Sequence, residues 1–141
     1  MDLKAIRDRI DGIDRDLVRL LGERMEAAVL AGRLKGEVKD SGREADVVAS
    51  VRSLSHGVLG PDFGAGLWES LMGESRRIQE GRPETVGFQG MHGANSEDAA
   101  RRLRGDWIAI PCAEFGEVID MVSSGLLDYG ILPVENTSGG Y

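Results

Sequence analysis

Apolar residues recur every three or four positions along the first 38 residues, which is the spacing of one face of an α-helix. Of the eleven positions on this seam, ten are apolar and one is Arg24. The pattern predicts one helix of about 35 residues, roughly 50 Å long. A domain of this size cannot cover such a helix, so its seam must pack against another chain or face water. The apolar seam positions are Leu3, Ile6, Ile10, Ile13, Leu17, Leu20, Ala27, Ala31, Leu34 and Val38.

Arg24 is the one charged residue on this seam, and two interpretations are open. Its stem can pack while the guanidinium reaches water, or the guanidinium can bind an anion inside. Lys35 favours the second, because eleven residues is nearly a whole number of turns and both cations then share one face. Arg7 lies seventeen residues before Arg24, roughly 25 Å along the axis. Arg7 could therefore reach the same ligand only from an antiparallel partner chain.

Two further helices are predicted before residue 80. The segment Ser41-Gly42-Arg43-Glu44 matches a capping box, which opens a helix through about Ser55 that Gly57 ends. Pro61 is a favoured first-turn residue and opens a third helix, which runs to about Gln79.

Each of the three helices places polar groups at one end of its inward face. Glu44 shares a stripe with apolar residues and Asp40 precedes it, while the apolar stripe of the third helix ends in Ser75 and Gln79. Taken singly, each group is explained by solvation at a helix end. Together with Arg24 they contain no nucleophile–base pair and no metal cluster. Such a set suits a small dianion that carries a hydroxyl group.

The pattern changes after residue 80. Gly81 and Pro83 interrupt the periodicity and predict a linker at 81–84. Short apolar runs at 86–88, 107–110 and 129–134 then alternate with helical patterns at 95–103 and 114–124. This β-α-β-α-β order is typical of parallel strands joined by crossover helices. We therefore predict a helical domain at 1–80 and an α/β segment at 85–141.

A glycine-rich turn, GMHGANS at 90–96, joins the first predicted strand to the next helix. Backbone N–H groups at a helix N-terminus can bind an anion, which makes Gly90, Gly93 and Ser96 candidates. The turn lacks the lysine and the spacing of a P-loop, so an ordinary strand-to-helix loop is the alternative.

Composition narrows the function further. A net charge of −7 argues against a nucleic-acid surface, so an anionic ligand needs a local cluster of cations. Aromatic residues make up only 5%, which argues against base stacking. The single cysteine, Cys112, excludes an internal disulfide and fits a reducing cytoplasm. His56 and His92 give no zinc spacing, and no apolar run is long enough for a membrane span. We expect no metal and no cofactor.

Residues 3–79 resemble the all-helical class of chorismate mutases. The matching segments are LKAIRDRIDGIDRDLVRLLGERMEAAVLAGRLK, KDSGREADVV and ESRRIQ. Residues 85–141 resemble the start of a prephenate dehydratase domain. The segments that carry this resemblance are VGFQGMHGANSEDAA and GLLDYGILPVENTSGGY. The order of the two halves is that of bifunctional enzymes of phenylalanine synthesis.

The resemblance implies a three-helix mutase domain that forms an intertwined homodimer with shared sites and converts chorismate to prephenate. Arg24 and the partner's Arg7 would hold the carboxylates of the substrate. Lys35 and Gln79 would donate to its ether oxygen. The other polar residues would position the substrate: Ser75 at a carboxylate, and Asp40, Arg43 and Glu44 around the ring hydroxyl.

For the second half, the resemblance implies a lobe like those of periplasmic binding proteins. Its cleft would be lined by the ENTS segment, with Glu135, Asn136 and Thr137 as candidates. Met91 stands where the family usually has proline, and the Thr-Arg-Phe catalytic segment and a regulatory ACT domain are missing from these 141 residues. We therefore expect a truncated chain without dehydratase activity. Two alternatives stay open: a non-catalytic helical dimerisation or regulatory module that binds a shikimate-pathway acid, and an independent small-molecule lobe at 85–141.

Overall fold

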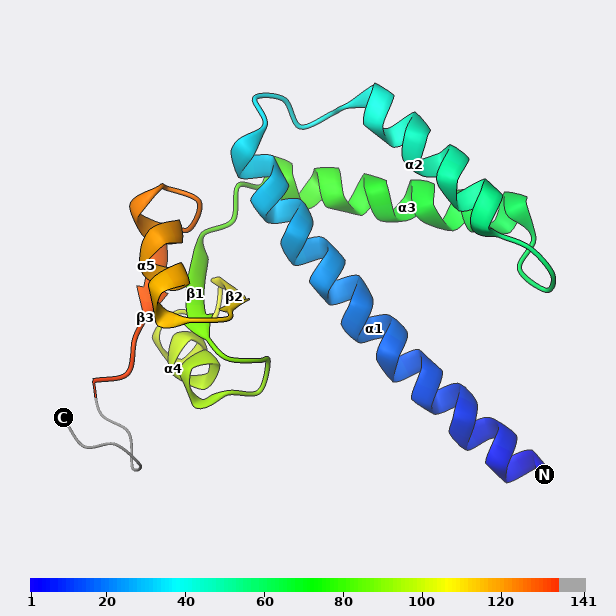
Figure 1. Ribbon diagram of the computed structural model, residues 1–141, viewed down its shortest axis with the longest axis horizontal. Helices are drawn as coiled ribbons and strands as arrows, with labels where there is room; N and C mark the ends of the chain where they lie inside the picture. Colours follow the sequence, from blue (N-terminus) through cyan, green and yellow to red (C-terminus); the bar gives the residue numbers. More distant parts are fainter. Residues whose placement is uncertain (135–141) are drawn as a thin grey trace.

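The computed structural model describes residues 1–134, in which three helices precede a small α/β layer. Figure 1 shows the helical part beside the sheet, which lies at the end of the molecule away from the N-terminus. The predicted fold class, an all-α part followed by a βαβαβ segment with a parallel sheet, is confirmed. The elements are α1 (Leu3–Leu34), α2 (Ser41–Leu54), α3 (Pro61–Glu80), β1 (Thr85–Gln89), α4 (Asn95–Leu103), β2 (Ile108–Cys112), α5 (Phe115–Ser123) and β3 (Tyr129–Ile131).

Helix α1 is 32 residues long, so the prediction that it reaches Val38 was wrong. Asp2 caps its start, where the carboxylate accepts a hydrogen bond from the Ala5 N–H at 2.8 Å. At the other end Lys35 leaves the helical conformation, and its ammonium group donates to the Val38 carbonyl at 2.8 Å. This contact closes a turn containing Gly36 and stops the helix after Leu34.

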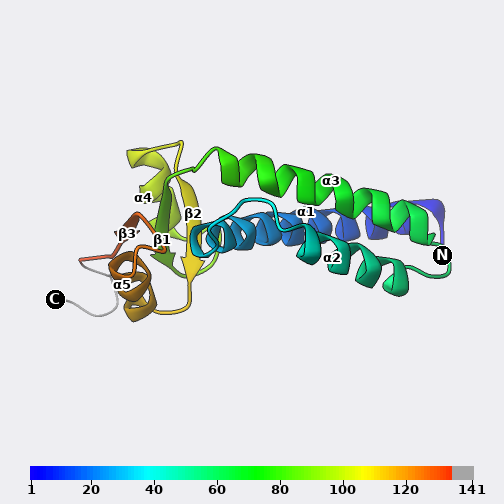
Figure 2. The same ribbon diagram turned by 90° about the horizontal axis from the view of Figure 1, so that it is seen from above.

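The N-terminal half of α1 stands clear of the other elements, α3 packs against its C-terminal half, and α2 packs on α3 (Figure 1). Seen from above, the three helices extend from the same side of the α/β layer (Figure 2). Val29, in the packed half, is 4% exposed. Along the rest of the helix the apolar seam faces solvent, and five of its residues have exposed fractions of 43–51%. A single chain therefore leaves a long apolar stripe in water, although burying it is favourable. The five residues are Ile6, Ile10, Ile13, Leu17 and Leu20.

Helix α2 begins at Ser41, but its N-cap is Asp40 and not Ser41 as the capping-box pattern predicted. The Asp40 carboxylate accepts from the Arg43 N–H at 3.0 Å. With the cap supplied by Asp40, the side chain of Glu44 is free to turn toward α3. Helix α3 starts at Pro61, as predicted.

The sheet has the order β2-β1-β3, and both pairings are parallel. Gly87 pairs with Ile110 on one side and with Gly130 on the other. A Cβ at Gly87 would lie 2.6 Å from Leu127 Cδ1, and one at Gly130 would lie 2.7 Å from Val118 Cγ1. The two glycines therefore let α5 and the loop after it pack closely against the strands.

All three strands differ from the predicted ranges: β1 spans 85–89 and not 86–88, β2 spans 108–112 and not 107–110, and β3 ends at 131 and not at 134. β2 begins after Trp107, because the Trp107 N–H bonds the Arg104 carbonyl in a turn at 3.3 Å. β3 ends at Ile131, two residues before Pro133, which has no N–H to continue the ladder. No helix among the described residues has the length and apolarity that crossing a bilayer requires.

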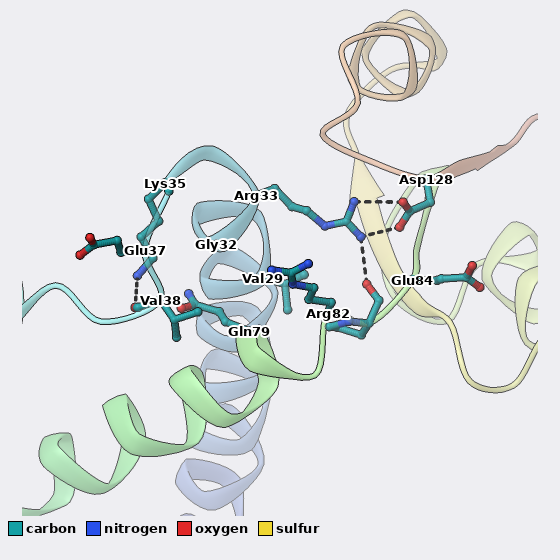
Figure 3. Close-up of a pocket in the computed structure, with 12 residues that line it drawn as sticks. Val29, Gly32, Arg33, Lys35, Glu37, Val38, Gln79, Arg82, Glu84 and Asp128 are labelled. Atoms are coloured by element: carbon teal, nitrogen blue, oxygen red, sulfur yellow. Dashed lines mark hydrogen bonds and ion pairs between the residues drawn. The ribbon is translucent and has the colours of Figure 1, made fainter.

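One ion pair ties α1 to the sheet. Arg33 forks onto Asp128, with Nη1–Oδ1 and Nη2–Oδ2 distances of 3.0 and 2.5 Å, and also donates to the Pro83 carbonyl at 2.9 Å (Figure 3). The Arg33 hydrogen bonds, helped by the Thr85 N–H and opposed by burial, lower the pKa of Asp128 to about 2.

A second contact joins α1 to the glycine-rich turn. His92 lies between Glu26 of α1, with an Nε2–Oε1 distance of 2.6 Å, and Glu97 of α4, with an Nδ1–Oε1 distance of 2.9 Å. Burial opposes the charge on His92, but hydrogen bonds and attraction from Glu97 and Glu26 raise its pKa above the usual value. Burial also raises the pKa of Glu26. The charged form of His92 therefore links the two parts.

We expect His92→Gln to remove a pH-dependent part of the stability. A pKa raised in the folded state means that the stabilisation is complete below about pH 6.5 and is lost as the pH rises through the folded pKa. Its size should be about 0.5 kcal/mol, since His92 is 40% exposed and solvent screens the pair. Calorimetric melting between about pH 6 and 8.5 measures it. His56→Gln, at an exposed position, is the control; a His92→Gln profile parallel to that of the wild type would contradict the prediction.

Candidate functional site

A cavity of about 310 Å³ lies between the C-terminal half of α1, the loop that follows it, and helices α2 and α3. Seven of the eight residues that the sequence analysis assigned to a mutase site line it. They come from segments that lie up to 55 residues apart in the sequence, and the fold brings their side chains to one cavity. The seven are Arg24, Lys35, Asp40, Arg43, Glu44, Ser75 and Gln79.

Arg24 is half-buried and turns toward α3 instead of extending into water. Its Nη1 donates to the Ser75 Oγ at 3.1 Å. Ser75 is 8% exposed, and its hydroxyl donates onward to the Leu71 carbonyl at 2.9 Å. Ser75 thus holds the guanidinium against the cavity wall, in the orientation that the anion-binding interpretation predicts.

Gln79 is fixed in one orientation. Its Nε2 donates to the Ala28 carbonyl of α1 at 2.6 Å, while its Oε1 is buried and has no hydrogen-bond partner among the described residues. An amide nitrogen carries two N–H groups, so one remains for a ligand. Gly32 makes this arrangement possible, because a Cβ there would lie 2.9 Å from the Gln79 Cγ.

We expect Gly32→Ala to displace Gln79 and lower activity without unfolding the protein. Alanine favours a helix by about 1 kcal/mol over glycine, which offsets the strain of moving a flexible side chain. Loss of one positioned donor should lower kcat at least about 10-fold. Steady-state kinetics and thermal melting measure both effects. The control is Gly22→Ala in the same helix, where an added Cβ meets nothing within 4 Å; equal kinetics for the two variants would contradict the role of Gly32.

Sequence reasoning missed one residue of this cavity, Arg76. It forms an ion pair with Glu44 across the gap between α3 and α2. Both side chains are partly buried, at 32% and 22% exposed. Its spacing in the sequence could have identified it. Arg76 lies four residues after Met72 and three before Gln79, which places all three on one face of α3.

A second cavity, of about 410 Å³, lies at the junction of the two parts. Figure 3 shows Arg33 bound to Asp128 on one side and Lys35 folded onto Val38 on the other. Lys35, Val38 and Gln79 line both cavities, so the second one adjoins the first. Its best-placed cation, Arg33, is already paired, which leaves the first cavity as the better anion site.

Arg7, the eighth candidate, lies on the exposed half of α1 and not in the cavity of its own chain. In the α/β part the N–H groups of two candidates are engaged internally: Gly90 donates to the Cys112 carbonyl at 3.0 Å, and Gly93 to Glu97 Oε2 at 2.6 Å. Ser96 is half-buried in the first turn of α4. Glu135, Asn136 and Thr137 lie outside the described residues.

Glu97 was also missed. It is 3% exposed and accepts hydrogen bonds from Gly93, His92 and Arg101. Burial opposes its charge, but these donors hold the pKa of Glu97 below its usual value. The Glu97 carboxylate of the chain itself therefore occupies the place at this turn where an anionic ligand would bind. Sequence reasoning could have found Glu97 because acidic residues are favoured in the first turn of a helix. Within residues 1–134 no cluster of three His, Cys, Asp or Glu residues could hold a metal ion.

Comparison with known proteins assigns both parts. The family model of chorismate mutase type II matches residues 6–80, and that of prephenate dehydratase matches residues 86–141. The chain belongs to the chorismate mutase type II family. The resemblance inferred from the sequence is thereby confirmed for this family, and the second match confirms a partial dehydratase segment after it.

Two bacterial relatives that match nearly all of this chorismate mutase family member are named as bifunctional. The bifunctional chorismate mutase/prephenate dehydratase of Pseudomonas aeruginosa is 31% identical over 148 residues, which cover 98% of this chain and 40% of the relative. That of Escherichia coli K12 is 30% identical over 158 residues, with 98% and 41% covered. An arogenate dehydratase/prephenate dehydratase of Arabidopsis thaliana is 38% identical over 63 residues, with 45% and 16% covered. The chain thus spans about 40% of the length of its bifunctional relatives. No solved structure matches it.

Proposed function

We propose that the chain is a chorismate mutase of phenylalanine and tyrosine biosynthesis, acting in the cytoplasm without metal or cofactor. The observation that carries this proposal is the single cavity that collects Arg24, Lys35, Ser75 and Gln79 around a space for a small dianion. Chorismate is such a dianion, with two carboxylates, an ether oxygen and a ring hydroxyl. A module that only dimerises has no need to point these groups inward together.

The rearrangement of chorismate to prephenate breaks one C–O bond and forms one C–C bond within the same molecule. It needs no nucleophile and no proton transfer, in keeping with a cavity that offers neither. The site has to hold the compact conformer and stabilise negative charge on the ether oxygen. Arg24, held by Ser75, binds a carboxylate, while Lys35 and the free N–H of Gln79 donate to the ether oxygen. Asp40, Arg43 and Glu44 surround the ring hydroxyl.

We propose further that two chains form an intertwined homodimer in which each site is shared. The open seam of α1, with residues such as Ile10 and Leu17 about half exposed, is the surface that a second copy would cover. An antiparallel partner helix would bring Arg7 of the partner subunit to Arg24, which no single helix can do because roughly 25 Å separates them. This Arg7 would hold the second carboxylate.

The direct test is the loss of chorismate absorbance with purified protein, measured beside Arg24→Ala. Removing one partner of a partly buried charge pair costs roughly 3 kcal/mol, so kcat/KM should fall on the order of 100-fold. Arg19→Ala, on the same helix but at a 57% exposed side chain, serves as the control and should keep wild-type kinetics. Binding of chorismate without turnover by the wild type would instead establish the non-catalytic module. Wild-type kinetics in Arg24→Ala would reject the role of that residue.

For residues 85–141 we propose no dehydratase activity in the chain as given. The Thr-Arg-Phe segment that the resemblance associates with catalysis does not occur in the sequence. Incubation with prephenate and measurement of its dehydration product tests this point. Product formed at a rate proportional to protein concentration would overturn it.

A further inference from the structure

The ion pair between Glu44 and Arg76 has no counterpart among the site roles given so far, and it lies in the wall of the cavity. Glu44 comes from the first turn of α2 and Arg76 from the last third of α3. The bond joins Arg76 Nη1 to Glu44 Oε1. Within the described part of the chain no hydrogen bond involves the other oxygen, Oε2, so it is available to a ligand.

A carboxylate in this cavity is an obstacle to a dicarboxylate ligand unless a cation offsets it. The charged groups that line the space around Glu44 are Arg24 and Lys35 of the α1 end, Asp40 of the connecting loop, Arg43 of α2 and Arg76 of α3. Arg24 and Lys35 face the space for the ligand, and Arg43 is exposed. Arg76 alone is bonded to Glu44. It therefore neutralises that carboxylate without using a cation needed elsewhere.

Arg76 also fixes the direction of Glu44. Like Glu44, it lines both this cavity and a second groove formed by α2 and α3. A guanidinium with a planar set of donors holds a carboxylate in a defined orientation. With Oε1 held by Arg76, Oε2 has no hydrogen bond within the described residues and can accept one from a ligand in the cavity.

We propose that Arg76 is a positioning residue that determines specificity: by binding Glu44 it orients a carboxylate oxygen to accept the ring hydroxyl of the substrate, and it removes the repulsion that this carboxylate would exert on a dicarboxylate. This inference rests on the proposed function and extends it. Arg76 acts through Glu44 and does not touch the substrate. A ligand that carries the hydroxyl is thereby selected over one that lacks it.

The test uses two stable bicyclic ether dicarboxylates, one with a ring hydroxyl and one without, titrated calorimetrically into the full chain. The wild type should prefer the hydroxylated compound by about 10-fold, the value of one hydrogen bond to a charged group. Arg76→Met, which keeps the length and loses the charge, should abolish the preference and weaken both compounds. Glu44→Gln should abolish the preference alone. The double variant should bind both compounds more tightly than Arg76→Met, because it removes the unpaired carboxylate.

Arg77→Met is the matched control, since Arg77 is the next residue, 70% exposed and paired only with Glu74 on the surface. It should keep the wild-type preference, and Arg76→Lys should restore part of it. A lower melting temperature in Arg76→Met with an unchanged preference would show a merely structural role and overturn the inference. Turnover is measured separately: a wild type that binds with the stated preference but does not convert chorismate would reject the proposed function while supporting Arg76. A wild type that binds neither compound would overturn both.

Discussion

Replacing Lys35 with alanine should lower kcat for chorismate by about 100- to 1,000-fold while KM changes far less, the size of effect expected when one preorganised donor to a developing oxyanion is lost. The Lys35 ammonium is half-buried and lies at the cavity, where it donates to the Val38 carbonyl at 2.8 Å in the unliganded chain. Charge grows on the ether oxygen only as its bond breaks. An interaction made mainly in the transition state affects kcat more than KM. Initial rates of absorbance loss over a range of chorismate concentrations separate the two constants.

The same substitution leaves the fold intact. Lys35 caps α1 through its backbone N–H, which bonds the Ala31 carbonyl at 3.1 Å, and alanine keeps that bond. The melting temperature should therefore change by only a few degrees, corresponding to about 1 kcal/mol. Lys39→Ala, four residues on in the same loop and exposed, controls for the loss of a positive charge. A kcat in Lys35→Ala equal to that of the wild type, or a change confined to KM, would rule out the proposed donor role.

Periodicity predicted the helices because apolar residues at three- and four-residue steps mark one face of a helix. The seam of α1 and the inward stripe of α3 were both found from residues at three- and four-residue steps. The end of α1 was not, because it depends on a contact between the Lys35 side chain and the Val38 carbonyl. The N-cap of α2 is Asp40, one residue before the predicted Ser41, and this choice too depends on a local contact. Asp40 and Ser41 are both good caps, and only the backbone geometry chooses between them.

The set of site residues was predictable, but the contacts within it were not. Gly32 gives Gln79, 47 positions later, its place against α1, and no pattern within the helix indicated this contact. Arg76 was not assigned to the site from the sequence, and it is paired with Glu44 of another helix. Such contacts depend on how helices cross, which a pattern within one helix does not contain. Of the two interpretations left open for Arg24, packing with the head in water or an inward guanidinium, the second is in keeping with its bond to Ser75.

The division of α1 supports the proposal that each site is shared between two chains. Its last third carries Arg24, Gly32 and Arg33, and Lys35 follows as the C-cap; these residues contact α3, the sheet or the cavity. Its first half carries Arg7 and an apolar seam whose residues are about half exposed among the described residues. A helix that binds with one end and leaves the other uncovered is suited to exchange between two copies, each covering the seam of the other.

Leu17→Glu should convert the proposed dimer to a monomer and abolish turnover. Leu17 is 51% exposed in one chain and lies in the middle of the open seam. In the dimer a glutamate there would be an unpaired charge in an apolar interface, which costs about 3–5 kcal/mol. Without the dimer no Arg7 reaches the cavity, so kcat/KM should fall at least about 100-fold. Light scattering at micromolar protein measures the mass. Val18→Glu, one residue on, off the seam and 70% exposed, should remain dimeric and active; a monomeric wild type that turns over chorismate would reject the shared site.

Hybrid dimers separate a shared site from a dimer that is merely structural. Arg7→Ala and Arg24→Ala should each be nearly inactive alone, because every site in such a dimer lacks one of its two guanidinium groups. When the two variants are unfolded together and refolded in equal amounts, about half of the dimers are mixed. Each mixed dimer has one site with neither substitution and one site with both. Activity should therefore return to roughly a quarter of the wild-type value. If each site took both arginines from one chain, every site in the mixture would carry a substitution and no activity would return.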